Sequence, residues 1–220
     1  MTAYQPTSRR PIADLFRRTA GGAVRACVAL GIHPDAVSYA SILASLLAAG
    51  CFFFGVRWPW LLIVAPMFCY LRLWLNMLDG MVALASGKAS RRGEILNELP
   101  DRISDVLVFA AIAHSGLAQQ ALGYWAAIAA LMTAYVGTLG HAVAGAREYG
   151  GVMSKPWRMV AVHAGAWVTW AALKFGWRTT IWNLTWLDWA CVIVIAGCVQ
   201  TIFARLRQTF RRLQGATLPQ

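Results

Sequence analysis

The sequence predicts an all-α integral membrane protein: a bundle of six transmembrane helices with an N-terminal interfacial amphipathic helix. Hydrophobic residues make up 59% of the 220 residues and charged residues only 13%, well below the ~25% typical of soluble domains. Six apolar segments approach the roughly 20 residues that a spanning helix needs. The 11 Trp and 19 Gly are also typical of membrane proteins, where Trp lies at the interfaces and Gly packs helices.

The six predicted spans follow one another with short connections, which favours an antiparallel bundle. They are expected at residues 37–56, 60–84, 95–115, 121–144, 159–175 and 187–204. Together they form one membrane domain over residues 37–205, and residues 206–220 form a polar tail.

Residues 1–36 are expected to hold a basic tail and the interfacial helix. Within them Ile12, Leu15 and Phe16 belong to an apolar series at three- and four-residue steps, which is helical spacing, with charges between its members. A break before Pro34 ends this segment, and Asp35 or Ser38 is expected to cap the first span.

The basic residues predict the topology. Of the 20 Lys and Arg, 15 lie in segments on the side of the two termini, three lie on the opposite side, and Arg72 and Arg102 lie within spans. The positive-inside rule therefore predicts that both termini are cytoplasmic, in an inner (plasma) membrane. This distribution accounts for the net charge of +11 without nucleic acid as a partner, because basic loops attract anionic membrane lipids.

The nine acidic residues are concentrated, since five of them fall between Asp79 and Asp105. Asn76 and Asp79 are three residues apart and share a face of the second span, while Asn97, Asp101 and Asp105 form a stripe at four-residue steps on the third. A short loop joins these two helices, so both faces are expected to meet near the cytoplasmic boundary. Ionisable groups at membrane depth are costly and usually functional.

Glu98 flanks this stripe, and several adjacent carboxylates require a compensating cation. Oxygen ligands without a suitably placed His favour a hard divalent ion such as Mg²⁺, Mn²⁺ or Ca²⁺. Two such ions commonly hold a transferring phosphoryl group. The sequence therefore predicts a metal site that acts on phosphate.

The same segment carries a spaced motif over 26 positions. It reads Asn76-x-x-Asp79-Gly80-x-x-Ala83-Leu84, eight residues, then Gly93-x-x-x-Asn97-x-x-x-Asp101. This resembles the CDP-alcohol phosphatidyltransferase signature, D-x-x-D-G-x-x-A-R, eight residues, G-x-x-x-D-x-x-x-D. The resemblance implies transfer of a phosphatidyl group from a CDP-linked donor, with CDP-diacylglycerol expected, to a hydroxyl acceptor with release of CMP, in phospholipid biosynthesis.

The resemblance also implies roles for individual residues. Two divalent ions, Mg²⁺ or Mn²⁺, are expected, and the general base is Asp101 or Asp105. The expected metal ligands are Asn76, Asp79, Asn97, Glu98 and Asp101. Gly80, Ala83 and Gly93 are expected to let the substrate approach the helices closely. Arg147, Lys155 and Arg158, in the second inner loop, are expected to hold phosphate.

Three positions depart from the signature, because Asn76, Leu84 and Asn97 replace Asp, Arg and Asp. The chain is thus expected to be a divergent member, with a catalytically inactive membrane homologue as one alternative. An ion or solute transporter is the other, and it would spread its acids through the bilayer or carry broken helices in repeated halves. The acceptor alcohol stays open, and a homodimer is expected because family members are often dimers.

Overall fold

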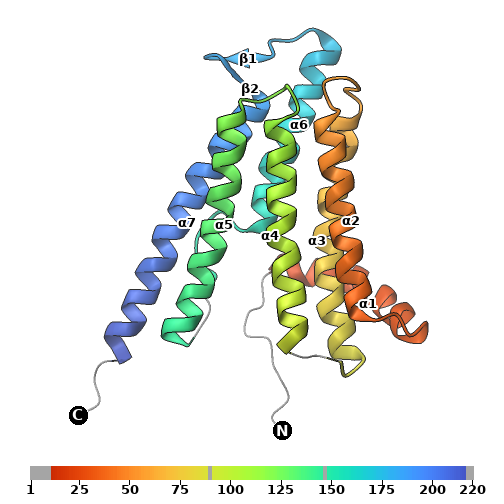
Figure 1. Cartoon of the computed structure of the whole chain (residues 1–220), viewed down its shortest axis with the longest axis vertical. Coiled ribbons are helices and arrows are strands. Elements are labelled where there is room, and N and C mark those ends of the chain that lie inside the picture. Colours follow the sequence, from red (N-terminus) through yellow and green to blue (C-terminus); the bar gives the residue numbers. More distant parts are fainter. Residues whose placement is uncertain (1–10, 89–90, 146–147, 217–220) are drawn as a thin grey trace.

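The computed structural model describes residues 11–88, 91–145 and 148–216, and helices account for most of them. The seven helices are α1 (Pro11–Ala29), α2 (Pro34–Phe53), α3 (Leu61–Ala85), α4 (Arg91–Ala113), α5 (Gln120–Ala144), α6 (Lys155–Phe175) and α7 (Trp186–Ala216). Helices α2 to α7 run along the long axis of the molecule, and α1 lies across one end (Figure 1). The predicted helical class is confirmed. The hairpin of β1 (Thr180–Ile181) and β2 (Leu184–Thr185) was not predicted.

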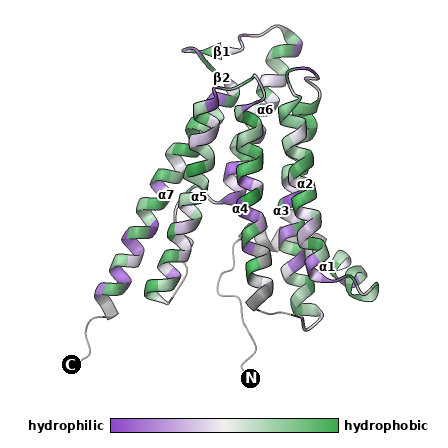
Figure 2. Cartoon of the chain, in the orientation of Figure 1, coloured by the Kyte–Doolittle hydropathy of each residue, from purple (hydrophilic) through white to green (hydrophobic). Residues whose placement is uncertain are grey.

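Four of these helices are long and apolar enough to cross a membrane: Pro34–Phe53, Leu61–Ala85, Gln120–Ala144 and Trp186–Gln214. Apolar residues dominate most of the helical surface (Figure 2). On α2, for example, the exposed Leu43, Leu46 and Leu47 share one face. Such a surface belongs in lipid, and the chain is an integral membrane protein.

Helices α4 and α6 overlap the predicted third and fifth spans but are not among these four. The first half of α4 carries Glu98, Asp101, Arg102 and Asp105, and these charges lower its hydropathy. The count of six spans therefore remains a prediction.

The helices form one bundle in which α2 packs against α3 and α4, and α5 packs against α4 and α7. Helix α6 contacts both α3 and α7, so it closes the bundle between them. The approach of α5 to α4 depends on Gly123, where an added Cβ would lie 2.7 Å from the Cβ of Ala113. Small residues at such a crossing allow the two backbones to come close.

The starts of two helices are held by side chains. The Asp35 amide donates to Nδ1 of His33 at 3.4 Å, so His33 caps α2, and the prediction that Asp35 or Ser38 caps it is wrong. At α7, Asp188 accepts the Thr185 amide at 2.9 Å and donates its own amide to the Thr185 hydroxyl at 3.0 Å. This reciprocal arrangement is a capping box. The other oxygen of Asp188 accepts the Gln119 amide at 2.6 Å, which ties the α4–α5 connection to α7.

Helix α1 packs its second half against α3. Ala20 is fully buried in a cluster with Leu78 and Val82, and Val24 packs against that cluster. This contact holds α1 beside the part of α3 that carries Asp79. An amphipathic face of α1 on the membrane surface remains a prediction.

Candidate active site

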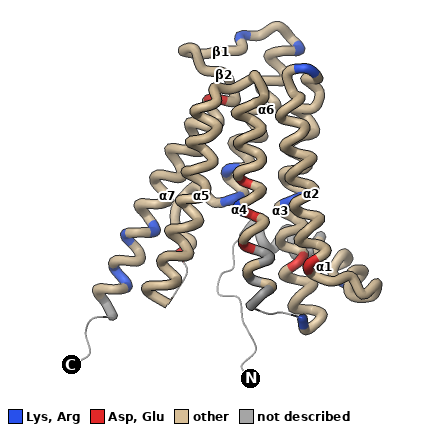
Figure 3. Tube along the Cα trace, in the orientation of Figure 1, with Lys and Arg blue, Asp and Glu red and all other residues tan. Residues whose placement is uncertain are grey.

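Charged residues gather in one half of the bundle. Away from the connections, Figure 3 places them on α3, α4 and α7 toward the end of the molecule where α1 lies, whereas the opposite halves of the helices carry few. This is the end at which the sequence predicts the acidic cluster.

Helix α3 contributes two oxygen-bearing side chains. The carboxylate of Asp79 is buried, and the hydroxyl of Ser38 on α2 donates to its Oδ2 at 2.5 Å. One turn earlier, Oδ1 of Asn76 is buried and has no hydrogen-bond partner among the residues that the structure describes. A buried polar atom without a partner is costly, which makes Asn76 Oδ1 a candidate ligand for a cation.

Helix α4 contributes Asp101 and Asp105, which are almost fully buried at 1% and 0% exposure. Between them and α3 lies the guanidinium of Arg72, itself 1% exposed. Its Nη2 is 3.2 Å from Asp101 Oδ1 and 3.1 Å from Asp105 Oδ1, and it also donates to the Asp101 carbonyl at 3.1 Å. Arg72 thus joins α3 to α4 through both acids.

Helix α6 supplies two more cations to the same carboxylates. Arg158 donates from Nη2 to Asp105 Oδ2 at 2.7 Å, and the Lys155 ammonium contacts Asp101 Oδ2. Lys155 also acts electrostatically on Asp79, so its charge is within range of acids on both α3 and α4. Buried carboxylates require such compensation.

Glu98 lies at the edge of this network, where it pairs with Arg102 at 2.9 Å. Within the described residues, no group of three or more His, Cys, Asp or Glu side chains forms a metal-binding cluster. The acids are therefore part of an ion-pair network rather than a group of bare carboxylates.

A cavity of about 290 Å³ opens beside this network. It is lined by Glu98, Arg102, Thr133, Ala134, Tyr149, Ser154, Lys155, Pro156, Arg158 and Arg205. Four of these ten side chains are cationic, so the cavity suits a phosphate or another anion.

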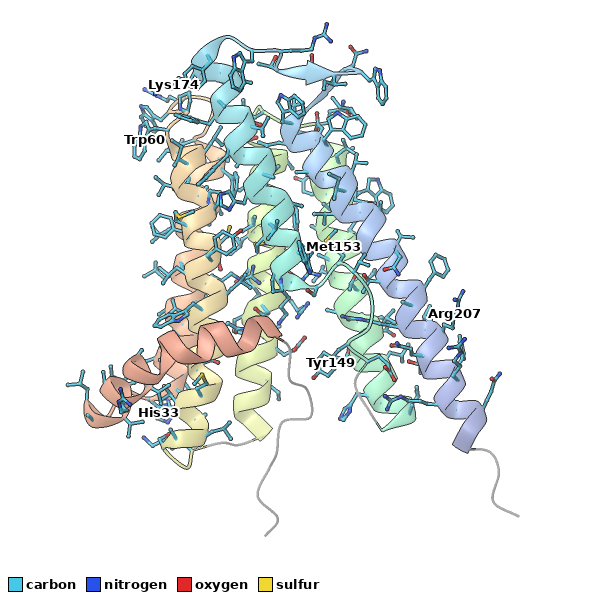
Figure 4. All side chains as sticks on the ribbon, turned by 180° about the vertical axis from the view of Figure 1, so that it is seen from behind. His33, Trp60, Tyr149, Met153, Lys174 and Arg207 are labelled. Carbon is cyan, nitrogen blue, oxygen red and sulfur yellow. The ribbon has the colours of Figure 1, made fainter. Side chains whose placement is uncertain are left out.

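Arg205 of α7 also holds the wall of the cavity in place. Its Nη1 donates to the Thr133 carbonyl at 2.6 Å, and its Nε donates to the Gly150 carbonyl at 3.1 Å. The segment from Tyr149 to Met153 passes beside α7 (Figure 4), and the Met153 amide donates to the Thr201 hydroxyl at 2.9 Å.

Gly151 lies in this segment with φ +100, and an added Cβ would be 2.4 Å from Cγ2 of Thr201. Only glycine combines this backbone conformation with so close a contact. The loop that leads into Lys155 therefore has a defined position against α7.

The structure brings together most of the predicted site residues. Asn76, Asp79, Gly80 and Ala83 follow one another on α3, and Asp101 and Asp105 meet Lys155 and Arg158 through ion pairs. Gly93 and Glu98 lie earlier on α4. The side chain of Asn97 and all of Arg147 lie outside the described residues.

Sequence reasoning assigned no role in the site to Ser38, Arg72 or Arg205. A signal for Arg72 was present, because a lone arginine in an apolar span requires a partner. Ser38 and Arg205 had no comparable signal, since serines are common in spans and basic residues follow the last span in any positive-inside protein.

Comparison with known proteins identifies the family. No protein-family model matches the chain. Phosphatidylinositol phosphate synthase of Mycolicibacterium smegmatis is 33% identical over 166 residues, which cover 72% of this chain and 70% of the relative. The chain belongs to the CDP-alcohol phosphatidyltransferase family. Inner membrane protein YnbA of Escherichia coli is 28% identical over 151 residues, 67% of this chain and 74% of that protein.

Solved structures give the same fold. Mycobacterium tuberculosis phosphatidylinositol phosphate synthase with CDP-DAG bound aligns with a TM-score of 0.70 at 23% identity, over 88% of this chain and 94% of that one. The same enzyme in complex with manganese and citrate aligns at 0.69 and 22% identity, over 87% and 88%. As a CDP-alcohol phosphatidyltransferase, the chain is a transferase of phospholipid biosynthesis.

Proposed function

We propose that this transferase moves the phosphatidyl group of CDP-diacylglycerol to the hydroxyl of a phosphorylated polar alcohol and releases CMP. The observation that carries the proposal is the cationic cavity beside Asp101. Lys155 lines the cavity and contacts the Asp101 carboxylate, so an acceptor phosphate in the cavity would place its alcohol near a carboxylate. Relatives named phosphatidylinositol phosphate synthase support an inositol phosphate as the acceptor.

The donor side of the site is assigned to α3 and the start of α4. Gly80 and Ala83 lie next to Asp79 and carry no bulky side chain, so the nucleotide can approach the helix closely. Gly93 lies in the first turn of α4 and has no side chain beyond hydrogen. A solved relative that contains CDP-DAG supports a CDP-linked lipid donor.

The residues present fit a divalent ion. Asn76 Oδ1 is buried with no partner in the described ranges, and Asp79 supplies a carboxylate. Oxygen donors of this kind are preferred by Mg²⁺ and Mn²⁺. When bound, the ion would polarise the pyrophosphate and stabilise the charge that develops on it. Asn76 and Asp79 would hold it, with Asn97, Glu98 and Asp101 as further candidates. A relative in complex with manganese supports the metal.

The general base is assigned to Asp101 rather than Asp105. Asp105 is 0% exposed, and both of its oxygens face arginines at 3.1 and 2.7 Å. Two guanidiniums keep the Asp105 carboxylate ionised and make it a weak base, so its role here is to position Arg72 and Arg158, whereas Asp101 pairs with one guanidinium at 3.2 Å and with the Lys155 ammonium. Asp101 contacts Lys155 at the cavity wall and can accept a proton when that lysine turns to an acceptor phosphate.

The arrangement in the membrane follows from the same charges. We propose six spans, with α4 and α6 as the two that carry the site, both termini and the active site on the cytoplasmic side, and α1 on the membrane surface. The three bases of the opposite side lie at the other end of the bundle (Figure 3), Arg57 and Arg178 in connections and Lys174 in the last turn of α6, which the positive-inside rule favours. A homodimer is proposed from family membership.

The test is CMP release by the purified protein with CDP-diacylglycerol and Mn²⁺. Two pairs of acceptors are compared: inositol phosphate with inositol, and glycerol phosphate with glycerol. The difference in CMP release within each pair gives the contribution of the acceptor phosphate. We expect CMP only with a phosphorylated acceptor, loss of activity in EDTA, and loss in Asp101→Asn. No CMP with any acceptor would favour an inactive homologue or a transporter, and equal rates within each pair would refute the acceptor assignment.

A variant of the cavity sharpens this test. Arg205→Gln is expected to raise KM for the phosphorylated acceptor at least tenfold, because a charge-assisted contact is worth roughly 1.5–3 kcal/mol. Arg207→Gln is the matched control, since Arg207 is two residues away on α7 and exposed (Figure 4). Equal effects of the two variants would contradict a phosphate site in the cavity.

A further inference from the structure

We infer that the active site holds a single divalent ion, at Asn76 and Asp79, and that Lys155 supplies the second positive charge at Asp101. The inference rests on the proposed function and concerns the number of metal ions in it. The family resemblance implies two ions, which four motif carboxylates would hold. In this chain two of those four positions are Asn76 and Asn97.

The part of the site carried by α3, which includes Asn76 and Asp79 and is called the α3 half, has the properties of a single-ion site. Within the described part of the chain, Oδ1 of Asn76 is buried without a hydrogen-bond partner, and Asp79, the one acid in the sequence of α3, is 3% exposed. The Ser38 hydroxyl at 2.5 Å fixes the orientation of that carboxylate. One neutral oxygen and one carboxylate offer oxygen ligands to one divalent ion and leave no carboxylate on α3 for a second.

The part of the site carried by α4, which includes Asp101 and Asp105 and is called the α4 half, already contains cations that neutralise its acids. Asp101 faces Arg72 on one oxygen and Lys155 on the other, and Asp105 faces Arg72 and Arg158. Arg102 adds a fourth cation, at 3.8 Å from Asp101 and 3.9 Å from Asp105, so the two carboxylates meet four positive charges and have net positive surroundings before any metal binds. A second divalent ion at Asp101 would have to displace the Lys155 ammonium and approach Arg72, against electrostatic repulsion in a buried site.

Lys155 is positioned to take the role of the second divalent ion that the family resemblance implies. Its ammonium contacts Asp101, acts on Asp79 and lines the cavity. It can therefore bind a phosphoryl oxygen at the point where donor and acceptor meet. A lysine suits this position because its ammonium is a compact point charge on a flexible stem.

The inference is tested by counting bound Mn²⁺ on the purified chain without substrate. Calorimetric titration gives the stoichiometry, and electron paramagnetic resonance distinguishes one isolated Mn²⁺ from a spin-coupled pair, since paired metals lie ~3.5–4 Å apart. We expect one ion per chain with an uncoupled spectrum. Two ions, a coupled spectrum, or no bound ion would overturn the inference.

Two variants test the assignment of the charges. Lys155→Met frees Asp101 and is expected to raise the count from one to two, whereas Lys174→Met, at the other end of α6, leaves it at one. Asn76→Asp adds a carboxylate to the α3 half and is expected to tighten binding at least tenfold with the count still one. A count of one in Lys155→Met, or no tightening in Asn76→Asp, would contradict the assignment.

These results separate the ion count from the proposed transfer reaction. A wild-type chain that binds two ions and releases CMP refutes the single-ion site alone. A chain that binds one ion and releases no CMP with any acceptor refutes the transfer reaction and keeps the ion count.

Discussion

Replacement of Arg72 by Met would test the ion-pair network most directly. Met keeps the apolar stem of the side chain and removes the guanidinium, which is 1% exposed and lies 3.2 Å from Asp101 and 3.1 Å from Asp105. The variant leaves two buried carboxylates with fewer cations. Asp105 keeps Arg158, and Asp101 keeps Lys155.

The size of the effect follows from these contacts. Removal of one partner from a buried ion pair destabilises a protein by about 3–5 kcal/mol. The cations that remain, Arg158, Lys155 and the more distant Arg102, place Arg72→Met at the lower end, about 3 kcal/mol. In a chain of this length each kcal/mol shifts the unfolding midpoint by ~2–4 °C, so a fall of roughly 6–12 °C is expected.

Thermal unfolding in detergent micelles measures this shift. Arg57→Met is the matched control, because Arg57 is exposed at the opposite end of the bundle and lies over the ring of Trp58 at 5.0 Å. The double variant Arg72→Met/Asp105→Asn removes one of the uncompensated charges and is expected to be less destabilised than the sum of the single variants, with a coupling of about 1–3 kcal/mol. Equal midpoints for the Arg72 and Arg57 variants, or the absence of coupling, would refute the reasoning.

Three further variants probe other parts of the molecule. Ser38→Ala removes the hydroxyl that orients the carboxylate on α3 and should weaken apparent Mn²⁺ affinity in CMP release by roughly tenfold or more. The control Ser86→Ala loses only bonds to carbonyls of its own helix and should leave this affinity unchanged. Equal Mn²⁺ affinities of the two variants would contradict a role of Ser38 in the site. Asp188→Ala leaves two backbone amides without their acceptor, at ~1–3 kcal/mol each. The unfolding midpoint should therefore fall while KM for the acceptor stays constant. A changed KM would show that the start of α7 affects the site. Gly151→Ala should raise KM for the phosphorylated acceptor several-fold by displacing the loop against α7, whereas Gly87→Ala, also at positive φ but with open space around it, should leave KM unchanged.

The helices were largely predictable from the sequence, because apolar length and turn residues act locally. The segment predicted at 60–84 is the helix Leu61–Ala85, and that predicted at 121–144 is Gln120–Ala144. The last helix runs to Ala216, beyond the apolar stretch that ends at 204, since helix continuation does not require apolar residues. The hairpin of β1 and β2 was missed because each strand has only two residues.

The site was predictable in its acids but not in its cations. The spacing of Asp79 and Asp101 placed them on facing helices, and the motif led to the family. The sequence did not pair Arg72 with Asp101 and Asp105, because that contact spans 29 and 33 residues and depends on how α3 packs beside α4. The cationic cavity likewise depends on Arg205, which reaches it from the last helix.

The sequence by itself determined the membrane class, the positions of most helices and the family, since these depend on composition and on spacing within one or two turns. Only the tertiary structure decided which charge neutralises which acid. An ion pair forms where packing brings two side chains within about 4 Å, and that distance is set between helices far apart in the chain. Lys155 and Asp101 are separated by more than 50 residues and meet only because α6 packs in the same bundle as α4.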